Sequence, residues 1–214
     1  MIDSYKHKGL RKKLIAEIGD KGIIDKNVLV AIEKIPRHLF MDSSFLEYAY
    51  IDKAFPIGEG QTISQPYTVA FQTQLLEIKK GDRILEVGTG SGYQACVLIE
   101  TGAKVFTIER IKNLYDKTKL FLPSIGYSPK MFYGDGYKGL PSYAPFDGII
   151  VTAGAPFIPE DLIRQLKVGA NLVIPIGNGD IQVMTTITKT SETKTEKKEW
   201  GTFRFVPLLG NKEH

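Results

Sequence analysis

The stretch LEVGTGSGY, residues 85–93, decides the fold. An apolar run, RILEVG at 83–88, leads into three closely spaced glycines, and a stretch with helical spacing follows over 92–101. This order of strand, glycine-rich turn and helix is typical of α/β sheets that bind a ligand at the carboxyl ends of their strands. Glycine lets the backbone approach such a ligand closely. The stretch therefore predicts a ligand-binding loop in an α/β domain.

Further along the chain, four more short apolar runs are typical of buried strands. They lie at 103–109, 130–135, 146–152 and 170–177. Stretches with helical spacing separate some of them, at 111–125 and 159–167. Strands that alternate with crossover helices predict a doubly wound, mostly parallel α/β sheet, which is a Rossmann-like arrangement.

The N-terminal part of the chain is expected to be helical and then loop-rich. Residues 4–35 show the spacing of two helices, the second opened by Asp25 and ended by Pro36. Glycine and proline are frequent over 37–65, which predicts loops, and helical spacing resumes at Pro66.

The C-terminal part changes pattern. Residues 181–189 and 201–208 alternate as strands do, around the charged stretch KTSETKTEKKE at 189–199. No helix separates them, so they predict an antiparallel hairpin at the sheet edge. We expect a single domain over 1–214. Its parts are an N-terminal segment over 1–65, a cofactor-binding core over 66–180 and edge strands over 181–214.

Composition narrows the class of protein. The chain has 214 residues, is 43% hydrophobic and carries a formal charge of +4, which allows one sizeable core and does not require a nucleic-acid partner. The densest basic run, residues 6–13, favours a solvated helix face. Cys96 is the lone cysteine, and no secretory signal or membrane-spanning run is visible, which predicts a cytoplasmic protein. Three scattered histidines predict no metal site.

The spacing of the glycines separates two cofactors. A dinucleotide site has the pattern G-x-G-x-x-G, whereas Gly88, Gly90 and Gly92 are spaced by two and Tyr93 occupies the third dinucleotide position. Glu86 would repel a pyrophosphate but attract an ammonium group. This pattern favours S-adenosylmethionine over NAD, although a NAD-linked oxidoreductase stays an alternative.

Two acidic residues follow the next strands of the predicted sheet. Glu109 closes the second strand and suits two ribose hydroxyls, and Asp135 after the third strand suits an adenine amino group. A solvated strand end and a turn aspartate are the structural alternatives for these residues.

The stretch GQTISQPYTVA at 60–70 contains hydroxyls and amides but no histidine, lysine or carboxylate. A carboxylic acid has a pKa near ~4 and is ionised at neutral pH, so a carboxylate acceptor of a methyl group needs no catalytic base. Pro66 suits the first helical position, with Gln65 as the N-cap. Free N–H groups at this helix start favour an anion, to which Thr62 and Ser64 can donate. A serine that merely caps the helix is the alternative.

Several motifs together resemble the protein-L-isoaspartate O-methyltransferase family, in order along the chain from about Pro36 to Leu208. They are FPIGEGQTISQPY at 55–67, LEVGTGSGYQA at 85–95, TIERI at 107–111, GDGYKG at 134–139, APFDGIIVTA at 144–153 and RFVPL at 204–208. The resemblance implies methylation of the α-carboxylate of L-isoaspartyl residues in damaged proteins by S-adenosylmethionine. It also implies that the ester then closes to a succinimide, from which normal aspartate can form.

The resemblance also implies roles for individual residues. Ser64 resembles the active-site serine, with Thr62 and Ile63 beside it against cofactor and substrate. The remaining cofactor contacts that it implies are Glu86, Gly88, Thr89, Gly90, Ser91, Gly92, Glu109, Arg110, Asp135 and Gly136. Val206, Pro207 and Leu208 resemble a C-terminal strand that frames the substrate peptide, together with Thr62 and Ser64.

Alternatives of other classes remain at this point. The chain can be a methyltransferase with another acceptor, or a nucleic-acid-binding module that uses residues 6–13. His38 in IPRHLF is interpreted as a structural residue rather than a base, since a carboxylate acceptor needs none.

Overall fold

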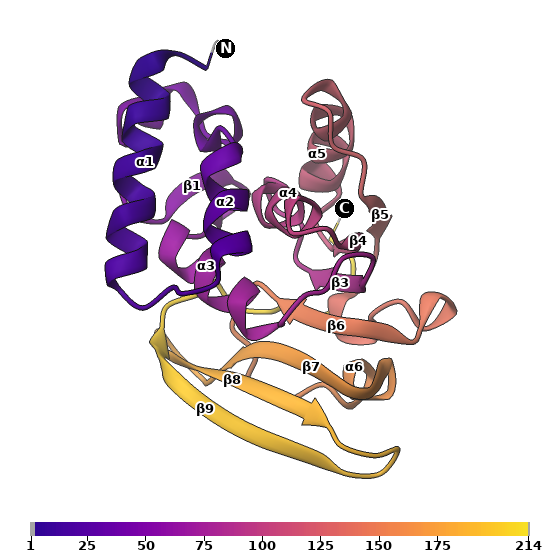
Figure 1. Cartoon of the computed structure of the whole chain (residues 1–214). Coiled ribbons are helices and arrows are strands. Elements are labelled where there is room, and N and C mark those ends of the chain that lie inside the picture. The colour runs from indigo at the N-terminus through magenta and orange to yellow at the C-terminus, as the bar shows by residue number, and fades with distance from the viewer. Residues whose placement is uncertain (1–2, 214) are drawn as a thin grey trace.

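The fold is built on one twisted, seven-stranded sheet, which a computed structural model describes within residues 3–213 (Figure 1). The strand order is β5-β4-β3-β6-β7-β8-β9. Its strands are β3 (Arg83–Val87), β4 (Lys104–Glu109), β5 (Lys130–Tyr133), β6 (Phe146–Val151), β7 (Leu166–Ile176), β8 (Gln182–Lys189) and β9 (Thr195–Phe203). The strands β3 to β7 pair in parallel, while β8 and β9 pair antiparallel. The prediction of a mostly parallel sheet with an antiparallel C-terminal hairpin is confirmed.

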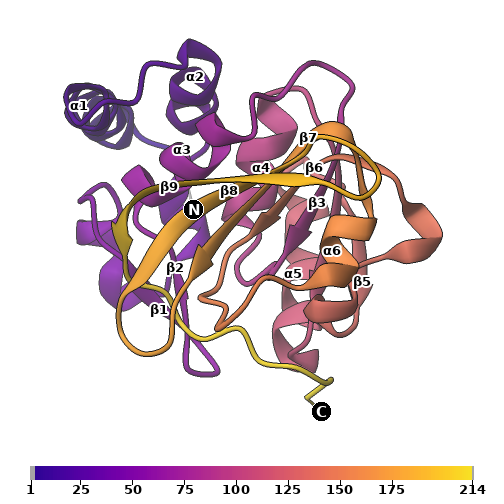
Figure 2. The ribbon, with the colours of Figure 1, turned by 90° about the horizontal axis from the view of Figure 1, so that it is seen from below.

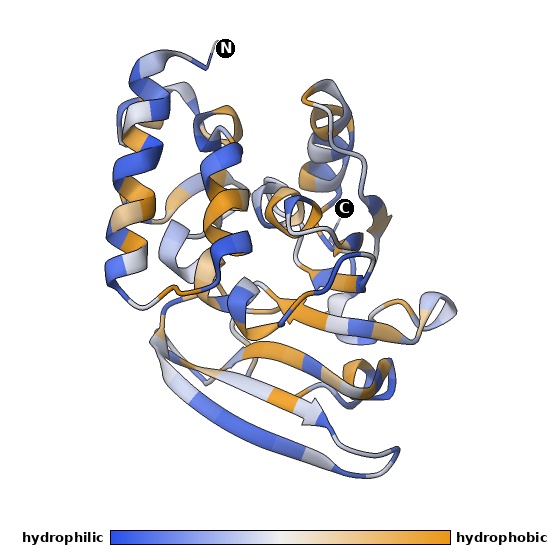
Figure 3. Ribbon diagram, viewed as in Figure 1, coloured by the Kyte–Doolittle hydropathy of each residue, from blue (hydrophilic) through white to orange (hydrophobic). Residues whose placement is uncertain are grey.

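Helices cover both faces of this sheet, and the side chains of each strand alternate between them. On one face pack α3 (Pro66–Leu75) and α4 (Tyr93–Glu100), where Ile84 meets Leu98 in the core. The opposite face, with Leu85 and Val87, packs against the short α6 (Glu160–Arg164). Alternate burial of one strand on two faces is what a doubly wound sheet requires. Figure 3 shows the apolar colour concentrated on the inner strands and the polar colour on β9.

The C-terminal hairpin differs from the prediction in its bounds. β9 begins at Thr195, so residues 195–199 of the charged stretch lie in the strand, and the turn occupies residues 190–194. β9 forms the sheet edge and faces solvent. An edge strand tolerates charged residues, and such a strand lacks the apolar alternation by which strands are predicted. The predicted second strand at 201–208 is therefore wrong beyond Phe203. Residues 204–208 leave the sheet and run across its carboxyl edge (Figure 2).

One helical prediction also changes. The helix predicted at 159–167 is the five-residue α6, because β7 already begins at Leu166. α5 (Lys112–Ser124) lies close to its predicted range.

The N-terminal segment forms a helical layer beside α3. It consists of α1 (Tyr5–Asp20), α2 (Lys26–Lys34), the 3₁₀ turns η1 (Arg37–Phe40) and η2 (Ser43–Tyr48), and a small hairpin of β1 (Phe55–Gly58) and β2 (Gln61–Ile63). The hairpin was not predicted, since strands of three and four residues carry little periodicity. Its second strand leads directly into the segment that precedes α3.

The basic run at 6–13 mostly occupies the solvated face of α1, as expected. Arg11 is the exception, because it is buried. Its guanidinium donates to both carboxylate oxygens of Asp3 at 2.8 Å and to the Glu33 carbonyl at 2.7 Å. It thereby joins α1 to α2 and to the chain that precedes α1.

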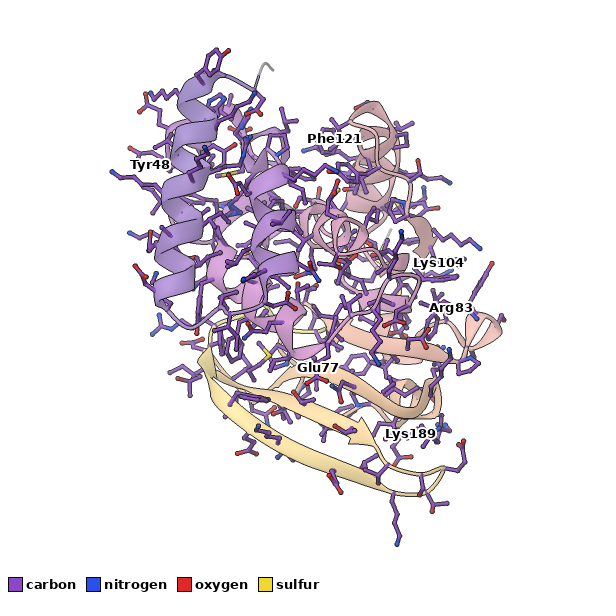
Figure 4. The ribbon with its side chains drawn as sticks, viewed as in Figure 1. Tyr48, Glu77, Arg83, Lys104, Phe121 and Lys189 are labelled. Carbon is purple, nitrogen blue, oxygen red and sulfur yellow. The ribbon has the colours of Figure 1, made fainter. Side chains whose placement is uncertain are left out.

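Charged residues also lie at the edge of the sheet where the parallel strands β3 and β4 begin. Figure 4 labels Arg83 and Lys104, which are register partners at the start of β3 and β4. Lys189, at the end of β8, lies on the same side of the molecule. These residues are therefore remote from the carboxyl ends of β3 and β4.

His38 is fully buried beneath α1, which agrees with its structural interpretation. Its Nδ1 lies 2.6 Å from the Tyr50 hydroxyl, and its ring lies 3.9 Å from that of His7. Burial is the largest cause that lowers the pKa of His38, from 6.5 to about 4. The folded protein therefore holds a neutral imidazole at neutral pH.

This pKa predicts an acid-sensitive stability. Between pH 6.5 and about 4 the unfolded chain binds a proton at His38 that the folded chain does not bind, so the contribution of His38 to the free energy of unfolding decreases as the pH falls. The variant His38→Gln cannot titrate and should lose less stability over the same window. Urea unfolding at pH 7, 5.5 and 4.5 measures both proteins. Equal pH dependence in the two proteins would contradict the prediction.

Candidate functional site

A cavity lies at the carboxyl ends of β3, β4 and β6. Its walls come from the segment before α3, the glycine-rich loop, the end of β4 and the C-terminal segment. The residues that line it are Gln61, Thr62, Ile63, Ser64, Val69, Val87, Gly88, Thr89, Gly90, Ser91, Tyr93, Gln94, Ile108, Glu109, Arg110, Ile111, Gly136, Thr152, Ala153, Val206, Pro207, Leu208 and Leu209. The structure thus brings together most of the predicted site residues, at the sheet edge where the strand pattern places a ligand.

The glycine-rich loop is shaped by steric demands. Gly88 has φ +99°, and a Cβ there would overlap the Thr152 hydroxyl oxygen. That hydroxyl donates to the Gly88 carbonyl at 2.7 Å, so the loop is fastened to the end of β6. Gly92, with φ +83°, does not line the cavity. It lies against α5, where a Cβ would meet Leu122 and Thr118. The predicted contact of Gly92 with a cofactor is replaced by packing behind the loop.

Glu109 lines the cavity and is held by the backbone. One carboxylate oxygen accepts from the Gly90 N–H at 2.8 Å, and the other accepts from the Ile111 N–H at 2.9 Å. Each oxygen keeps a further lone pair, so the carboxylate can still accept from two neighbouring hydroxyls. Arg110 also lines the cavity and forms an ion pair with Glu213 at 2.7 Å.

Glu86 lies elsewhere than predicted. Its side chain is fully buried behind the loop and does not line the cavity. Neither carboxyl oxygen has a hydrogen-bond partner among residues 3–213, and burial raises the pKa of Glu86 to about 8. Glu86 thus lies outside the residues that line the cavity, and its contact with a cofactor stays a prediction.

Gln94 carries another unsatisfied oxygen near the loop. Its Nε2 donates to the Thr73 hydroxyl at 2.9 Å, while its buried Oε1 has no partner among the described residues. Gln94 lines the cavity beside the loop. Sequence reasoning missed it, since a glutamine in the first turn of a helix carries no distinctive pattern.

Asp135 is a capping residue in this structure. Its carboxylate accepts from the Tyr137 N–H at 3.0 Å and from the Asn211 N–H at 3.1 Å, and it opens the 3₁₀ turn η3 (Gly136–Lys138). It does not line the cavity, whereas Gly136 does. The alternative of a turn aspartate describes its geometry, and the adenine contact stays a prediction.

Ser64 does not cap α3. Gln65 is the N-cap and Pro66 the first helical residue, as predicted, and the Ser64 hydroxyl has no hydrogen-bond partner within residues 3–213. The Asp52 carboxylate instead accepts from the Tyr67 N–H at 2.8 Å. The capping alternative for Ser64 is therefore wrong, and the expected free N–H groups at this helix start are fewer, since an aspartate already occupies one.

Arg37 fixes the backbone at Ser64. This fully buried guanidinium donates to the carbonyls of Ser64, Lys53 and Ala49 at 3.2, 2.9 and 3.1 Å, and it lies over the Tyr93 ring. Because the Ser64 carbonyl accepts from Arg37, this buried guanidinium fixes the position of Ser64 beside the cavity.

A second, smaller pocket adjoins the cavity at Ser64. We call it the acceptor pocket. It is lined by Ala54, Thr62, Ser64, Gln65, Thr68, Thr152, Arg204, Phe205 and Val206. Hydroxyls, an amide and one guanidinium line it, with no acidic residue or histidine among these residues. Sequence reasoning missed Thr152 and Arg204, although both stand at the edges of quoted motifs.

The segment Val206–Leu208 closes one side of both spaces. The Val206 carbonyl accepts from the Gly154 N–H at 2.8 Å, and the Leu208 N–H donates to the Gly154 carbonyl at 2.7 Å. The segment is therefore an extended cover over the end of β6 rather than a strand of the main sheet.

Asp3, His7 and His38 have donor atoms within 4.8 Å of one another, a spacing that a metal ion can bridge. Arg11 donates to both Asp3 oxygens, and its charge opposes a cation at that carboxylate. The two imidazole planes are inclined by only 32°, so their in-plane lone pairs hardly converge. This arrangement suits the packing of α1 against η1 better than a metal.

The strand order, the glycine-rich loop after β3 and the acidic residue at the end of β4 define a Rossmann-like methyltransferase. A family model described as protein-L-isoaspartate(D-aspartate) O-methyltransferase matches residues 9–213. The chain belongs to this family. No helix among the described residues is long and apolar enough to cross a membrane.

Relatives in the family cover the whole chain. A protein-L-isoaspartate O-methyltransferase of Christiangramia forsetii is 62% identical over 99% of this chain and 100% of its own length. A second, of Flavobacterium psychrophilum, is 61% identical with the same coverage.

Two solved structures have the same fold. A protein-L-isoaspartate O-methyltransferase, 30% identical, matches with a TM-score of 0.84 over 94% of this chain and 66% of that chain. A Plasmodium falciparum protein, described as a putative protein-L-isoaspartate O-methyltransferase in complex with S-adenosyl-L-homocysteine, matches with a TM-score of 0.80 at 29% identity. The match covers 94% of this chain and 99% of that one.

The loop geometry predicts a defect for Gly88→Ala. An alanine Cβ would collide with Thr152 at a positive φ that alanine rarely adopts, so the loop must move. We expect S-adenosylmethionine binding, measured by calorimetry, to weaken by about tenfold or more. Gly126→Ala is the matched control, since Gly126 has φ +88° with open space around it and does not line the cavity. Equal affinities for the two variants would contradict a specific role for Gly88.

Proposed function

We propose that the protein transfers a methyl group from S-adenosylmethionine to the α-carboxylate of L-isoaspartyl residues in damaged proteins. Family membership and the names of its relatives support this reaction. One observation of the site carries it: the acceptor pocket beside the cavity offers hydrogen-bond donors and a cation, but no base, among the residues that line it. Such a pocket suits an acceptor that arrives already ionised.

The cavity fits the cofactor that this reaction needs. The ribose hydroxyls of S-adenosylmethionine can donate to Glu109, and the unpaired Oε1 of Gln94 is an acceptor for the ammonium group of the cofactor. Backbone at Gly88 and Gly90 leaves room for close approach, which a Cβ would fill. S-Adenosylmethionine supplies a methyl group on a positively charged sulfur, the leaving group of an in-line displacement.

The residues of the acceptor pocket have the task of holding and drying the carboxylate. Ser64 and Thr62 line both the pocket and the cavity, so their hydroxyls can donate to one carboxylate oxygen at the boundary. Arg204, which has no ion-pair partner among residues 3–213, can attract the anion. A new bond forms from the other oxygen to the methyl carbon, and the electron pair of the broken carbon–sulfur bond stays on sulfur. Alignment and removal of water, rather than proton transfer, lower the barrier.

Other titratable side chains of the cavity are poorly suited to act as a base. Both oxygens of Glu109 already accept from backbone N–H groups. Burial raises the pKa of the Tyr93 hydroxyl well above its ordinary value, so Tyr93 stays protonated. The chemistry is therefore expected to follow the ionisation of the substrate carboxyl rather than that of an enzyme residue.

A paired-peptide assay tests the proposed function. The full chain is incubated with methyl-labelled S-adenosylmethionine and two peptides that differ only in an isoaspartyl or an aspartyl linkage. Base-labile label should appear on the isoaspartyl peptide alone, because methyl esters hydrolyse in base. Label on a hydroxyl or amine, or equal label on both peptides, would show another acceptor.

Ser64→Ala tests the role of the free hydroxyl. Loss of one hydrogen bond to an anion should lower kcat/KM for the isoaspartyl peptide by about 10- to 100-fold. The melting temperature should change little, since this hydroxyl caps nothing. Ser142→Ala, at an exposed serine outside both spaces, is the control and should keep full activity. A Ser64→Ala protein that melts early yet turns over normally would make the serine structural.

A further inference from the structure

An open groove continues from the acceptor pocket along the molecular surface. It is lined by Gln65, Tyr67, Thr68, Phe71, Ile181, Trp200, Gly201, Thr202, Phe203 and Arg204. These residues come from α3, the start of β8 and the end of β9. We call it the aromatic groove, after Tyr67, Phe71, Trp200 and Phe203.

The four aromatic side chains form one connected cluster. The ring of Phe71 lies 5.7 Å from Tyr67, 5.2 Å from Phe203 and 6.2 Å from Trp200. The rings of Tyr67 and Phe203 stack at 6.2 Å with an interplanar angle of 10°. Such a cluster offers apolar surface of fixed shape, which is the usual lining of a recognition site.

Part of this apolar surface stays in contact with solvent. Trp200 is 42% exposed and Ile181 is 54% exposed. The Trp200 indole N–H donates to the Thr186 hydroxyl at 2.9 Å, and Lys198 lies 3.8 Å from the ring centroid, so the ring orientation is fixed without burial. Exposed apolar surface that is grouped and held in place is available to bury a side chain of a ligand.

The groove and the proposed reaction site are continuous. Gln65, Thr68 and Arg204 line both the groove and the acceptor pocket. The acceptor pocket in turn shares Ser64 and Thr62 with the cavity. A polypeptide whose carboxylate lies at Ser64 can therefore pass Arg204 and lie along the groove.

We propose that the aromatic groove is a specificity site for the damaged polypeptide, which binds an apolar or aromatic side chain close in sequence to the isoaspartyl residue. This inference rests on the proposed function, since the occupant is part of the same substrate. Burial of one such side chain against Trp200, Phe71 and Ile181 favours apolar over small polar neighbours. The selection acts on binding, because the groove lies outside the space where the methyl group transfers.

Peptide series test the groove. Each isoaspartyl peptide carries a single leucine or phenylalanine, and its other neighbouring residues are serine. The apolar residue is placed in turn at about three positions on either side of the isoaspartyl residue, because an extended chain advances by ~3.3 Å per residue. An apolar residue on one side should raise kcat/KM about tenfold over the all-serine peptide, through KM with kcat unchanged. Trp200→Thr and Ile181→Thr should each reduce towards one the ratio of kcat/KM for the apolar peptide to kcat/KM for the all-serine peptide. Val168→Thr, which changes an equally exposed strand residue outside the groove, should keep it.

The outcomes separate this inference from the function on which it rests. Methylation of all isoaspartyl peptides with a ratio of one at every position overturns the groove alone. A ratio that persists in both groove variants overturns it as well. A groove that a second copy of the chain covers would give a ratio of one, together with a dimer that Trp200→Thr dissociates in sedimentation. No methylation of any isoaspartyl peptide removes the proposed function and the groove with it.

Discussion

The buried guanidinium of Arg37 is the interaction on which the site depends. It has no exposed surface, and its partners are the carbonyls of Ala49, Lys53 and Ser64 and the face of Tyr93. A buried cation is costly unless its donors are satisfied, so the chain must follow a path that presents these carbonyls. Burial lowers the pKa of Arg37 to about 10, which leaves it charged at neutral pH. A single residue thereby links the N-terminal segment, the acceptor pocket and the first residue of α4.

The two sides of the site are held by different means. The cofactor side is built from the sheet itself, where Glu109 at the end of β4 accepts from the Gly90 N–H and Thr152 at the end of β6 donates to Gly88. The acceptor side combines β2, the start of α3 and the segment after β9, which are fixed by Arg37 and by the two backbone hydrogen bonds at Gly154. The sheet thus gives a general methyltransferase frame, and under the proposed function the elements outside it determine the acceptor.

Much of this frame could be predicted from local patterns. Short apolar runs and spaced glycines indicated the parallel sheet and the cavity edge, because buried strands and tight turns have direct signatures in sequence. What local patterns did not reveal depends on the rest of the fold. Glu86 is fully buried by the layers that pack over β3. Asp135 accepts from the Asn211 N–H far along the chain, besides the local Tyr137 N–H that a turn aspartate implies. Residues such as Gln94 gain their meaning from neighbours that no local pattern reveals.

The placement of Asp52 explains how a site without a base binds an anion at a defined position. Its carboxylate accepts from the Tyr67 N–H at the start of α3 and pairs with Lys21 at 2.8 Å. The helix start, which would otherwise attract a substrate carboxylate, is thus partly satisfied by an internal one, and Lys21 offsets its charge. Under the proposed function, the incoming anion is left with the hydroxyls of Ser64 and Thr62 at the boundary with the cavity, and with the cation of Arg204 at the other end of the acceptor pocket. Attraction along this pocket would then select the acceptor by position rather than by basicity.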